Sequence, residues 1–328
     1  MEQSKISIVK FMGMLLIYIL LGTLDFFKHI ETVLFPFLAL PFTLYCMRNK
    51  VSIKKQILFH AIVSLVLYAL MGNPYCILIY CIAVAIPTYM ILFLYQQEFS
   101  IPNIMMYTGL GLSVVVFIFF TFMKWVGVDF ELQFTKLLTE VNQNFASAVD
   151  YAVQVNTSAG LSSTELQQIA SQMKQMVAES IATLKVFYPA IIVSQLVMSS
   201  AMMIVIFNVI MRCKNKAFPS TKEVLEFRVS KIAVMLLVLC MLSSDSNTGM
   251  QESVMVLGLN LMWFLMNLLQ VAGTLGLIAL LRKTSINGVV KVSGYIAIVF
   301  LFIFFPYVTM FFGCLDAIFN YRKVKIVV

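Results

Sequence analysis

Charged side chains are scarce in this sequence. Asp, Glu, Lys and Arg make up 12% of the 328 residues, whereas 61% of the residues are hydrophobic. Soluble domains carry about 25% charged residues, so the composition excludes an ordinary water-soluble protein. Several apolar runs approach the roughly 20 residues that a helix needs to cross a bilayer. The sequence therefore predicts an all-α, polytopic transmembrane bundle of about eight to ten spanning or half-spanning helices.

Catalytic and ligand-binding motifs are also missing. The chain has no phosphate-binding glycine loop, no H-E-x-x-H and no G-x-S-x-G, and it has only two histidines. Its six cysteines lie in or beside apolar runs without a C-x-x-C pair, which predicts free thiols acting as small hydrophobes. We therefore predict no enzyme activity, no cofactor and no metal site. A membrane enzyme would need a polar cavity that holds at least two ionisable groups.

Basic residues outnumber acidic ones, giving a formal net charge of +8. A basic balance can indicate a nucleic-acid partner, but Lys and Arg also collect in the cytoplasmic loops of membrane proteins. Here they cluster in the N-terminal arm and in loops between apolar runs, around 48–55, 212–231 and 282–291. The pattern predicts a cytoplasmic N-terminus, a lipid bilayer as the main partner and no nucleic-acid partner.

The N-terminal part, 1–125, predicts five transmembrane helices, at about 11–24, 32–47, 56–72, 75–95 and 104–125. Pro36 and Pro41 predict a kink or partial unwinding of the second helix, because proline removes an amide donor. A Gly-Asn-Pro turn at 72–74 predicts a tight hairpin between the third and fourth helices. His60 in the third helix is expected to be a hydrogen-bonded interior residue rather than a proton relay.

The segment 126–185 is the only long polar stretch. Two apolar stripes with helical spacing predict a helical hairpin, and Ser162 with Glu165 forms a capping box for its second helix. Six acidic residues against three lysines, after an odd number of spans, place it outside the cytoplasm. The hairpin either covers the outer mouth of the bundle or acts as a lid or docking element.

The C-terminal part, 186–328, predicts helices at about 186–211, 232–244 and 253–283, followed by a segment broken at Pro306. Two short helices, 289–304 and 306–320, would return the basic tail to the cytoplasm, as the charge rule requires. Short proline-broken segments are tolerated when other helices surround them.

The apolar helix 253–283 carries three side-chain amides that we expect on one face with Gly273, namely Asn260, Asn267 and Gln270. Lipid offers no partner for a carboxamide, so this face should point into protein or into a polar cavity. Together with Gln195 and Ser199 of the helix 186–211, these amides form a candidate intramembrane polar site. The alternative is that they only make hydrogen bonds between helices.

Several strings resemble the YybS-like family of bacterial polytopic membrane proteins. They are FPFLALPFTLYCMR (35–48), YPA (188–190), FNVIMR (207–212), the Gly258–Asn260 pair leading to Gln270, and GCLDAIFNYR (313–322). The last string is similar to the family's C-terminal motif, carried here by Gly313, Asp316, Asn320 and Arg322. Because Asp316 and Arg322 lie six residues apart, they can pair only if a helix ends between them, with Asn320 or Tyr321 in the turn. EFRVSK (226–231) departs from the family's pattern of a proline after the arginine.

The N-terminal half is also similar, at the level of pattern, to substrate-binding subunits of energy-coupling-factor transporters. These resemblances imply a bacterial plasma membrane and a solute-carrying bundle. One functional hypothesis is a transport component that binds a small solute and depends on a separate ATPase module. The other is a non-transporting scaffold that docks envelope or cytoplasmic proteins.

Overall fold

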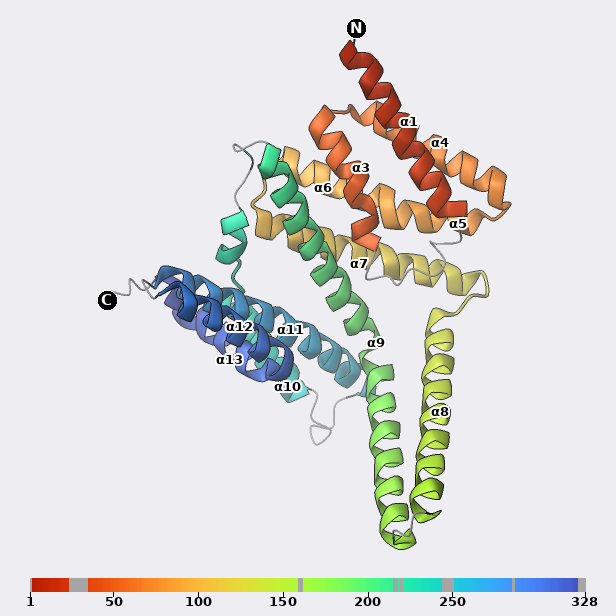
Figure 1. Cartoon of the computed structure of the whole chain (residues 1–328), viewed down its shortest axis with the longest axis vertical. Coiled ribbons are helices and arrows are strands. Elements are labelled where there is room, and N and C mark those ends of the chain that lie inside the picture. Colours follow the sequence, from red (N-terminus) through yellow and green to blue (C-terminus); the bar gives the residue numbers. More distant parts are fainter. Residues whose placement is uncertain are drawn as a thin grey trace. The chain divides into compact units, whose positions relative to one another are not determined.

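A computed structural model of the chain describes residues 2–23, 35–158, 162–214, 218, 221–243, 251–284 and 287–323. Helices form most of this described part, and it contains no β-strand (Figure 1). Five of its helices are long and apolar enough to cross a membrane, and a bent pair of shorter helices adds a sixth candidate. Two further apolar helices are shorter. The predicted all-α transmembrane class is confirmed.

The helices belong to two compact units. Unit 1 comprises Met1–Val116, Ile192–Leu239 and Phe264–Val328, and unit 2 comprises Phe117–Ile191 and Cys240–Trp263. Three long helices contribute to both units: α7 (Ile101–Trp125), α9 (Ser163–Lys214) and α11 (Glu252–Lys283). The polar contacts of the candidate site fall into two groups, one in each unit.

The N-terminal helices of unit 1 pack around buried aromatic rings. These helices are α1 (Glu2–Thr23), α3 (Phe35–Asn49), α4 (Ile53–Met71), α5 (Pro74–Tyr80) and α6 (Ile86–Gln96), with a π-helical turn at Cys81–Ala85 between the last two. Phe42 stacks on Phe59 with ring centroids 4.1 Å apart. His60 Nδ1 lies 2.7 Å from the Tyr80 hydroxyl, so the histidine is a hydrogen-bonded interior residue, as expected.

The turn at Gly72–Pro74 and the prolines of α3 were both predicted to shape the local backbone. The predicted turn is confirmed: Gly72 has a φ of 62° and ends α4, and the Asn73 side chain accepts a hydrogen bond from the Tyr75 amide, 3.0 Å long, to begin α5. The second helix was predicted to be kinked or partly unwound; the unwinding is absent, because α3 runs through Pro41 as one continuous helix, and the kink stays a prediction. Pro36 lies in the first turn of α3, where an amide donor is not needed. Residues 24–34 lie outside the described part.

Helices α7 and α9 approach closely within unit 1. A Cβ atom on Gly109 would lie 2.5 Å from the Cα atom of Val197, a distance that real side chains do not adopt. The glycine therefore lets the two backbones touch. Ile104 of α7 and Met203 with Ile204 of α9 are fully buried in the adjoining core.

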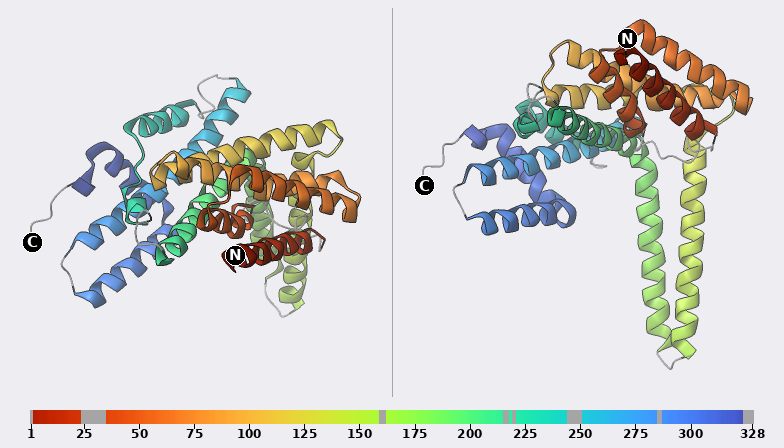
Figure 2. Two further views of the ribbon diagram at one scale, coloured as in Figure 1. Left: turned by 90° about the horizontal axis from the view of Figure 1, so that it is seen from above. Right: turned by 45° about the horizontal axis from the view of Figure 1, so that its top comes forward.

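Unit 2 contains the predicted helical hairpin, formed by α8 (Phe130–Ser158) and the first part of α9, which lie side by side in both figures that show them (Figures 1 and 2). The prediction of a separate helix beginning at 186 was wrong, because α9 continues from the hairpin through Pro189 as one 52-residue helix. Proline removes one backbone hydrogen bond and distorts a helix, but the helix can continue beyond it.

The hairpin buries only a narrow seam. Leu138 and Val149 of α8 and Ala170 and Ile181 of α9 are buried, and Lys174 forms an ion pair of 2.6 Å with Asp150 across the two helices. Most of the predicted apolar stripes stay exposed instead, including Leu137, Val141, Ile169, Met173 and Met176. Two helices packed only on each other cannot cover stripes that are wider than their line of contact.

The C-terminal part of unit 1 ends in a sharply bent helix pair. The short helix α10 (Lys231–Ser243) precedes α11, and α12 (Gly288–Phe304) and α13 (Pro306–Phe319) meet at an angle of 108°. The predicted break at Pro306 is confirmed. Lys291 in the first turn of α12 donates hydrogen bonds to the carbonyls of Arg282 and Thr284, and Lys283 donates to the carbonyl of Arg322 after α13. Both ends of the bent pair therefore contact the end of α11.

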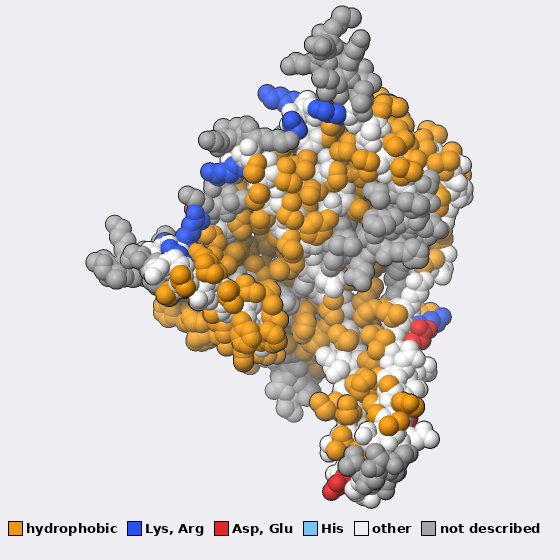
Figure 3. All heavy atoms as spheres, in the orientation of Figure 1, with side chains coloured by type: hydrophobic (Ala, Val, Ile, Leu, Met, Phe, Trp, Pro, Cys, Tyr) orange, Lys and Arg blue, Asp and Glu red, His pale blue; other side chains and the backbone are white. Residues whose placement is uncertain are grey.

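Large hydrophobic side chains cover much of the visible surface (Figure 3). Leu65 on α4, Ile232 on α10 and Ile303 on α12 are each more than 60% exposed. Such exposure would be unfavourable in water, whereas a bilayer removes these side chains from water.

Candidate functional site

The three amides of α11 have different surroundings. Asn260 belongs to unit 2, and Asn267 and Gln270 belong to unit 1. Each of the three was predicted either to line a cavity or to bond a neighbouring helix. The structure shows bonding to a neighbouring helix for Asn260 and Gln270, and a cavity for Asn267.

Asn260 bonds the backbone of α9 beside Pro189. Its Oδ1 atom accepts a hydrogen bond from the Ala190 amide, 3.0 Å long, and its Nδ2 atom donates to the carbonyl of Val186, 2.8 Å away. In a regular helix those two peptide groups would bond each other, because they lie four residues apart. Proline clashes with the preceding turn and opens it. The Asn260 carboxamide therefore satisfies the backbone where the proline distorts α9.

Gln270 makes a similar contact to α12 near Pro306. Its Nε2 atom donates a hydrogen bond of 2.9 Å to the carbonyl of Phe302. Phe302 lies four residues before Pro306, so its carbonyl is the one that the proline leaves without a helical donor. The Gln270 amide supplies the missing donor. Two of the three predicted site amides thus bond backbone groups next to a proline on another helix.

Asn267 lines a cavity of about 320 Å³ between α7, α9 and α11 in unit 1, here called the α7–α9–α11 cavity. The wall is otherwise almost entirely apolar and rich in methionine, with Met105, Met106, Met198 and Met202 among its members. Ser194 also lines it, and the Ser194 hydroxyl is buried without a hydrogen-bond partner in the described part of the chain. Methionine side chains are flexible and adapt to ligands of different shape.

The other two predicted site residues lie elsewhere on α9. Gln195 is exposed, and Ser199 is buried and donates a hydrogen bond of 3.2 Å to the carbonyl of Leu196. Neither lines the α7–α9–α11 cavity. The structure therefore brings Asn267 together with Ser194, which the sequence did not single out. The spacing of residues within the predicted helix 186–211 does not show which of its faces packs against α7, so the sequence could not predict which polar side chain lines the cavity.

The C-terminal motif begins at a very close helix crossing. A Cβ atom on Gly273 of α11 would lie 1.9 Å from the carbonyl oxygen of Thr309, and one on Gly313 of α13 would lie 2.0 Å from that of Leu269. Only glycine fits at either position, because the two backbones are in direct contact. This crossing fixes the position of α13, and with it the carboxylate of Asp316, relative to α11.

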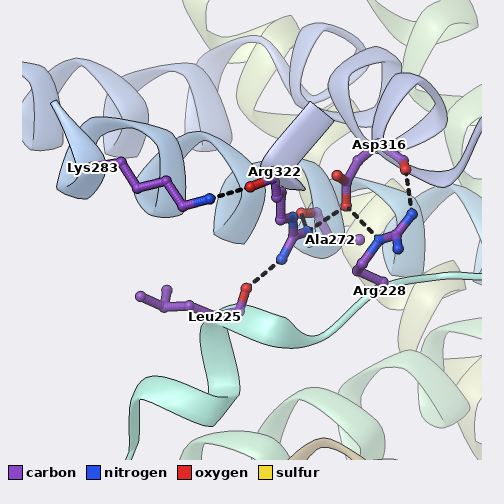
Figure 4. A network of polar contacts seen from close by, with 6 residues as sticks. All are labelled: Leu225, Arg228, Ala272, Lys283, Asp316 and Arg322. Atoms are coloured by element: carbon purple, nitrogen blue, oxygen red, sulfur yellow. Dashed lines mark hydrogen bonds and ion pairs between the residues drawn. The ribbon is translucent and has the colours of Figure 1, made fainter. Parts of the chain in front are cut away.

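Asp316 and Arg322 form a buried ion pair (Figure 4). Arg322 Nη2 lies 2.8 Å from Asp316 Oδ2, and the two side chains are 7% and 1% exposed. Helix α13 ends at Phe319, and Asn320 follows with a left-handed φ of 53°. This is the helix end that the six-residue spacing required, and asparagine tolerates the left-handed conformation well.

Arg322 also bonds two other segments of unit 1. Its Nη1 and Nη2 atoms donate to the carbonyls of Leu225 and Ala272, over 2.5 and 2.7 Å. Arg228 adds a second cation, with its Nη2 atom 2.9 Å from the Asp316 carbonyl and its Nε atom 3.6 Å from Asp316 Oδ2. The planar guanidinium carries five donors, so one arginine can join three chain segments. Sequence reasoning missed Arg228, although it stands in the EFRVSK string that was compared with the family.

Burial shifts the pKa values of Tyr321 and Arg322, two titratable residues that follow α13. Burial, followed by the nearby Asp316 carboxylate, raises the pKa of Tyr321 to about 12, so the phenol stays neutral at physiological pH. Burial also lowers the pKa of Arg322, and Asp316 opposes that shift. Arginine remains charged under such conditions. Asp316 Oδ1, Tyr321 Oη and Arg322 Nε are buried without hydrogen-bond partners in the described residues.

His, Cys, Asp and Glu side chains are scattered through the described part of the chain. No three His, Cys, Asp or Glu side chains gather there as metal ligands would. All six cysteines carry free thiols.

The apolar spans, the bent helix pair and the bonded intramembrane amides together define a multi-pass helical membrane protein. The family model described as "Predicted membrane protein (DUF2232)" matches residues 12–317, and the chain belongs to this family. Comparison with the curated proteins and with the solved structures found no match. The narrower resemblances, to the YybS-like family and to energy-coupling-factor subunits, stay predictions.

Proposed function

We propose that this protein is a membrane transport component that binds a small, largely apolar solute in the α7–α9–α11 cavity. The observation that supports the proposal is the cavity itself, which has about 320 Å³ of space and an almost entirely apolar wall. Ligand pockets commonly combine an apolar wall with a few polar groups that fix orientation. Since Asn260 and Gln270 bond neighbouring backbone, a strongly polar solute is disfavoured.

This function requires a separate energy source. The sequence contains no phosphate-binding glycine loop, so a separate ATPase module would energise transport, as the resemblance to energy-coupling-factor subunits implies. The proposed setting is a bacterial plasma membrane with the N-terminus and C-terminus cytoplasmic and residues 126–185 outside. Within this topology, residues 1–125 and 186–328 form the transmembrane bundle.

The test compares a cavity variant with a matched control. Ala201 lines the cavity and Ala61 is an exposed residue of α4 away from it. We expect full-length protein purified in lipid nanodiscs to retain an apolar molecule that mass spectrometry detects, A201W to lose it, and A61W to keep it. Identical small-molecule profiles for A201W and the unmodified protein would overturn the proposal.

A scaffold function is the second candidate, and one observation favours it. The hairpin leaves apolar side chains exposed on both helices, including Leu137 of α8, 56% exposed, and Met176 of α9, 66% exposed. Exposed apolar stripes commonly mark interaction surfaces. In vivo crosslinking should then capture envelope proteins with the unmodified hairpin but not with L137E or M176E. Capture that is unchanged in both variants would contradict the scaffold function.

A further inference from the structure

A second cavity lies at the base of the hairpin in unit 2. It has a volume of about 370 Å³ and lies between the last turns of α7, the start of α8 and the part of α9 around Pro189. We call it the hairpin-base cavity. Its lining combines the aromatic side chains of Phe117, Phe120 and Tyr188 with four charged ones, from Lys124, Asp129, Glu131 and Lys185. This mixture differs from the apolar wall of the α7–α9–α11 cavity.

The charges are distributed unevenly within this cavity. Lys124 Nζ lies 3.1 Å from Asp129 Oδ2 and 3.8 Å from Glu131 Oε2, so one ammonium is shared by two carboxylates. This group carries a surplus of one negative charge. Lys185 is exposed and has no ion pair or hydrogen bond from its side chain within the described residues. The cavity therefore offers one unbalanced negative charge and one unbalanced positive charge.

The backbone and the aromatic side chains add to this pattern. Pro189 lines the cavity and has no amide hydrogen, so it leaves the carbonyl of Lys185, four residues earlier, without its helical donor. That carbonyl can accept a hydrogen bond from an ammonium group. The Tyr188 ring is held by stacking on Phe134, with centroids 4.4 Å apart. Aromatic faces attract cations and also provide an apolar contact surface.

We infer that the hairpin-base cavity binds a zwitterion, a molecule that carries an ammonium group and a phosphate or carboxylate close together. The ammonium lies against Asp129 and Glu131, and the anionic group lies against Lys185. A phospholipid headgroup such as phosphoethanolamine has this chemistry, and so does a free zwitterion in solution. The described lining therefore combines charged and aromatic groups that suit a zwitterion, and it contains no histidine, cysteine or serine.

The position of the cavity connects it with the membrane boundary. Lys124 lies in the last turn of α7, and Asp129 and Glu131 follow within seven residues, before and at the start of α8. Charged residues at the end of a spanning helix lie where headgroups lie. A lipid with two acyl chains would place its headgroup at this level, while a soluble zwitterion would enter from the water side.

The test measures retention of lipids by the full-length protein in detergent, read by native mass spectrometry. The probes are phosphatidylethanolamine, phosphatidylglycerol, which lacks the ammonium, and free phosphoethanolamine. We expect phosphatidylethanolamine to be retained over phosphatidylglycerol, and K185Q and E131Q each to reduce that retention about three- to fivefold. Lys136 and Glu140 are exposed on α8 and do not line the cavity, so K136Q and E140Q serve as controls with matched charge changes and should leave retention unchanged.

The free headgroup distinguishes the source of the ligand. Competition by free phosphoethanolamine at millimolar concentration would show that the charged groups alone are recognised and that a soluble zwitterion suffices. No competition, together with selective retention of phosphatidylethanolamine, would identify the membrane lipid as the ligand. Equal retention of the two lipids without binding of free phosphoethanolamine, or equal effects of K185Q and K136Q, would overturn the inference.

Discussion

The side chain of Gln270 on α11 donates a hydrogen bond of 2.9 Å to the carbonyl of Phe302 on α12. Pro306 deprives that carbonyl of its helical donor, so the glutamine compensates for the proline across two helices. An intramembrane amide in this position stabilises the fold and does not need a solute to explain it. The same logic applies to Asn260, which bonds α9 on either side of Pro189.

We predict that Q270L lowers the free energy of unfolding by about 1–3 kcal/mol, because the Phe302 carbonyl is then buried without a donor. Unfolding of the purified protein in mixed micelles measures the change. T274V is the control, since the Thr274 hydroxyl donates to the Gln270 carbonyl within its own helix. It should lower the free energy of unfolding by less than Q270L does. A Q270L protein as stable as T274V would contradict the compensating role.

We predict that the destabilisation caused by N260L depends on Pro189. N260L should destabilise the protein, because the Ala190 amide and the Val186 carbonyl lose their partners. In a P189A background the helix can close, and those two groups can bond each other as in a regular helix. The loss of unfolding free energy caused by N260L should therefore be smaller in that background, by about 0.5 kcal/mol or more. Equal costs in both backgrounds, measured by the same unfolding assay, would show that the two residues act independently.

Removing one partner of the Asp316–Arg322 pair should destabilise the protein much more than replacing both partners with apolar residues. D316N leaves the buried Arg322 guanidinium without its counter-charge, which costs about 3–5 kcal/mol, whereas the double variant D316L/R322M removes both charges and should recover most of that loss. Accumulation in membranes and micellar unfolding measure both. K231Q is a control, because Lys231 is exposed. A double variant as unstable as D316N would argue that the arginine's bonds to Leu225 and Ala272 dominate.

Gly273 should accept no side chain. G273A places a Cβ atom 1.9 Å from the Thr309 carbonyl oxygen, so α11 and α13 must separate and the bent helix pair should lose its protection from hydrogen exchange. G13A in α1 is the matched control, because nothing lies within 4 Å of the added atom there. Alanine favours helix more than glycine does, by up to about 1 kcal/mol, so G13A should be neutral or stabilising.

The start of α8 should depend on pH through Asp129. The Leu132 amide donates a hydrogen bond to Asp129, and this bond, followed by the contact with Lys124, holds the pKa of that carboxyl below its usual range. The pKa is lower in the folded state, so the stabilisation is complete above the unfolded pKa of about 3.9 and is lost as the pH falls through the folded pKa. Hydrogen exchange of the first turn of α8 should speed up over that range once corrected for intrinsic rates.

D129N provides the comparison for this pH dependence. Asparagine caps a helix about as well as aspartate does, but it does not titrate. The variant should keep the first turn of α8 and lose the acid-dependent opening. If D129N opens with acid as the unmodified protein does, another group controls the hairpin base.

Prolines show how far local sequence can predict structure. Pro306 predicted a break between two short helices, and the bend of 108° confirms it. Pro41 predicted a kink or partial unwinding of α3, and the unwinding is absent; Pro189 was placed near a helix start although α9 runs through it. The same residue type gave three outcomes because the packing around each proline, and not the proline alone, decides whether the helix continues. Helix α9 runs through Pro189, whereas α12 and α13 bend at Pro306 even though Gln270 bonds the released carbonyl.

The sequence alone determined the helical membrane class, the Gly-Asn-Pro turn, the amphipathic hairpin and the helix end that pairing of Asp316 with Arg322 requires. Each depends on composition, periodicity or backbone conformation, which are local properties. Only the tertiary structure decided that Asn260 and Gln270 bond proline-released backbone, that Asn267 shares a cavity with Ser194, and that Arg228 joins the ion pair. Those outcomes depend on which faces of distant helices meet, and the spacing of residues within one helix does not specify its neighbours.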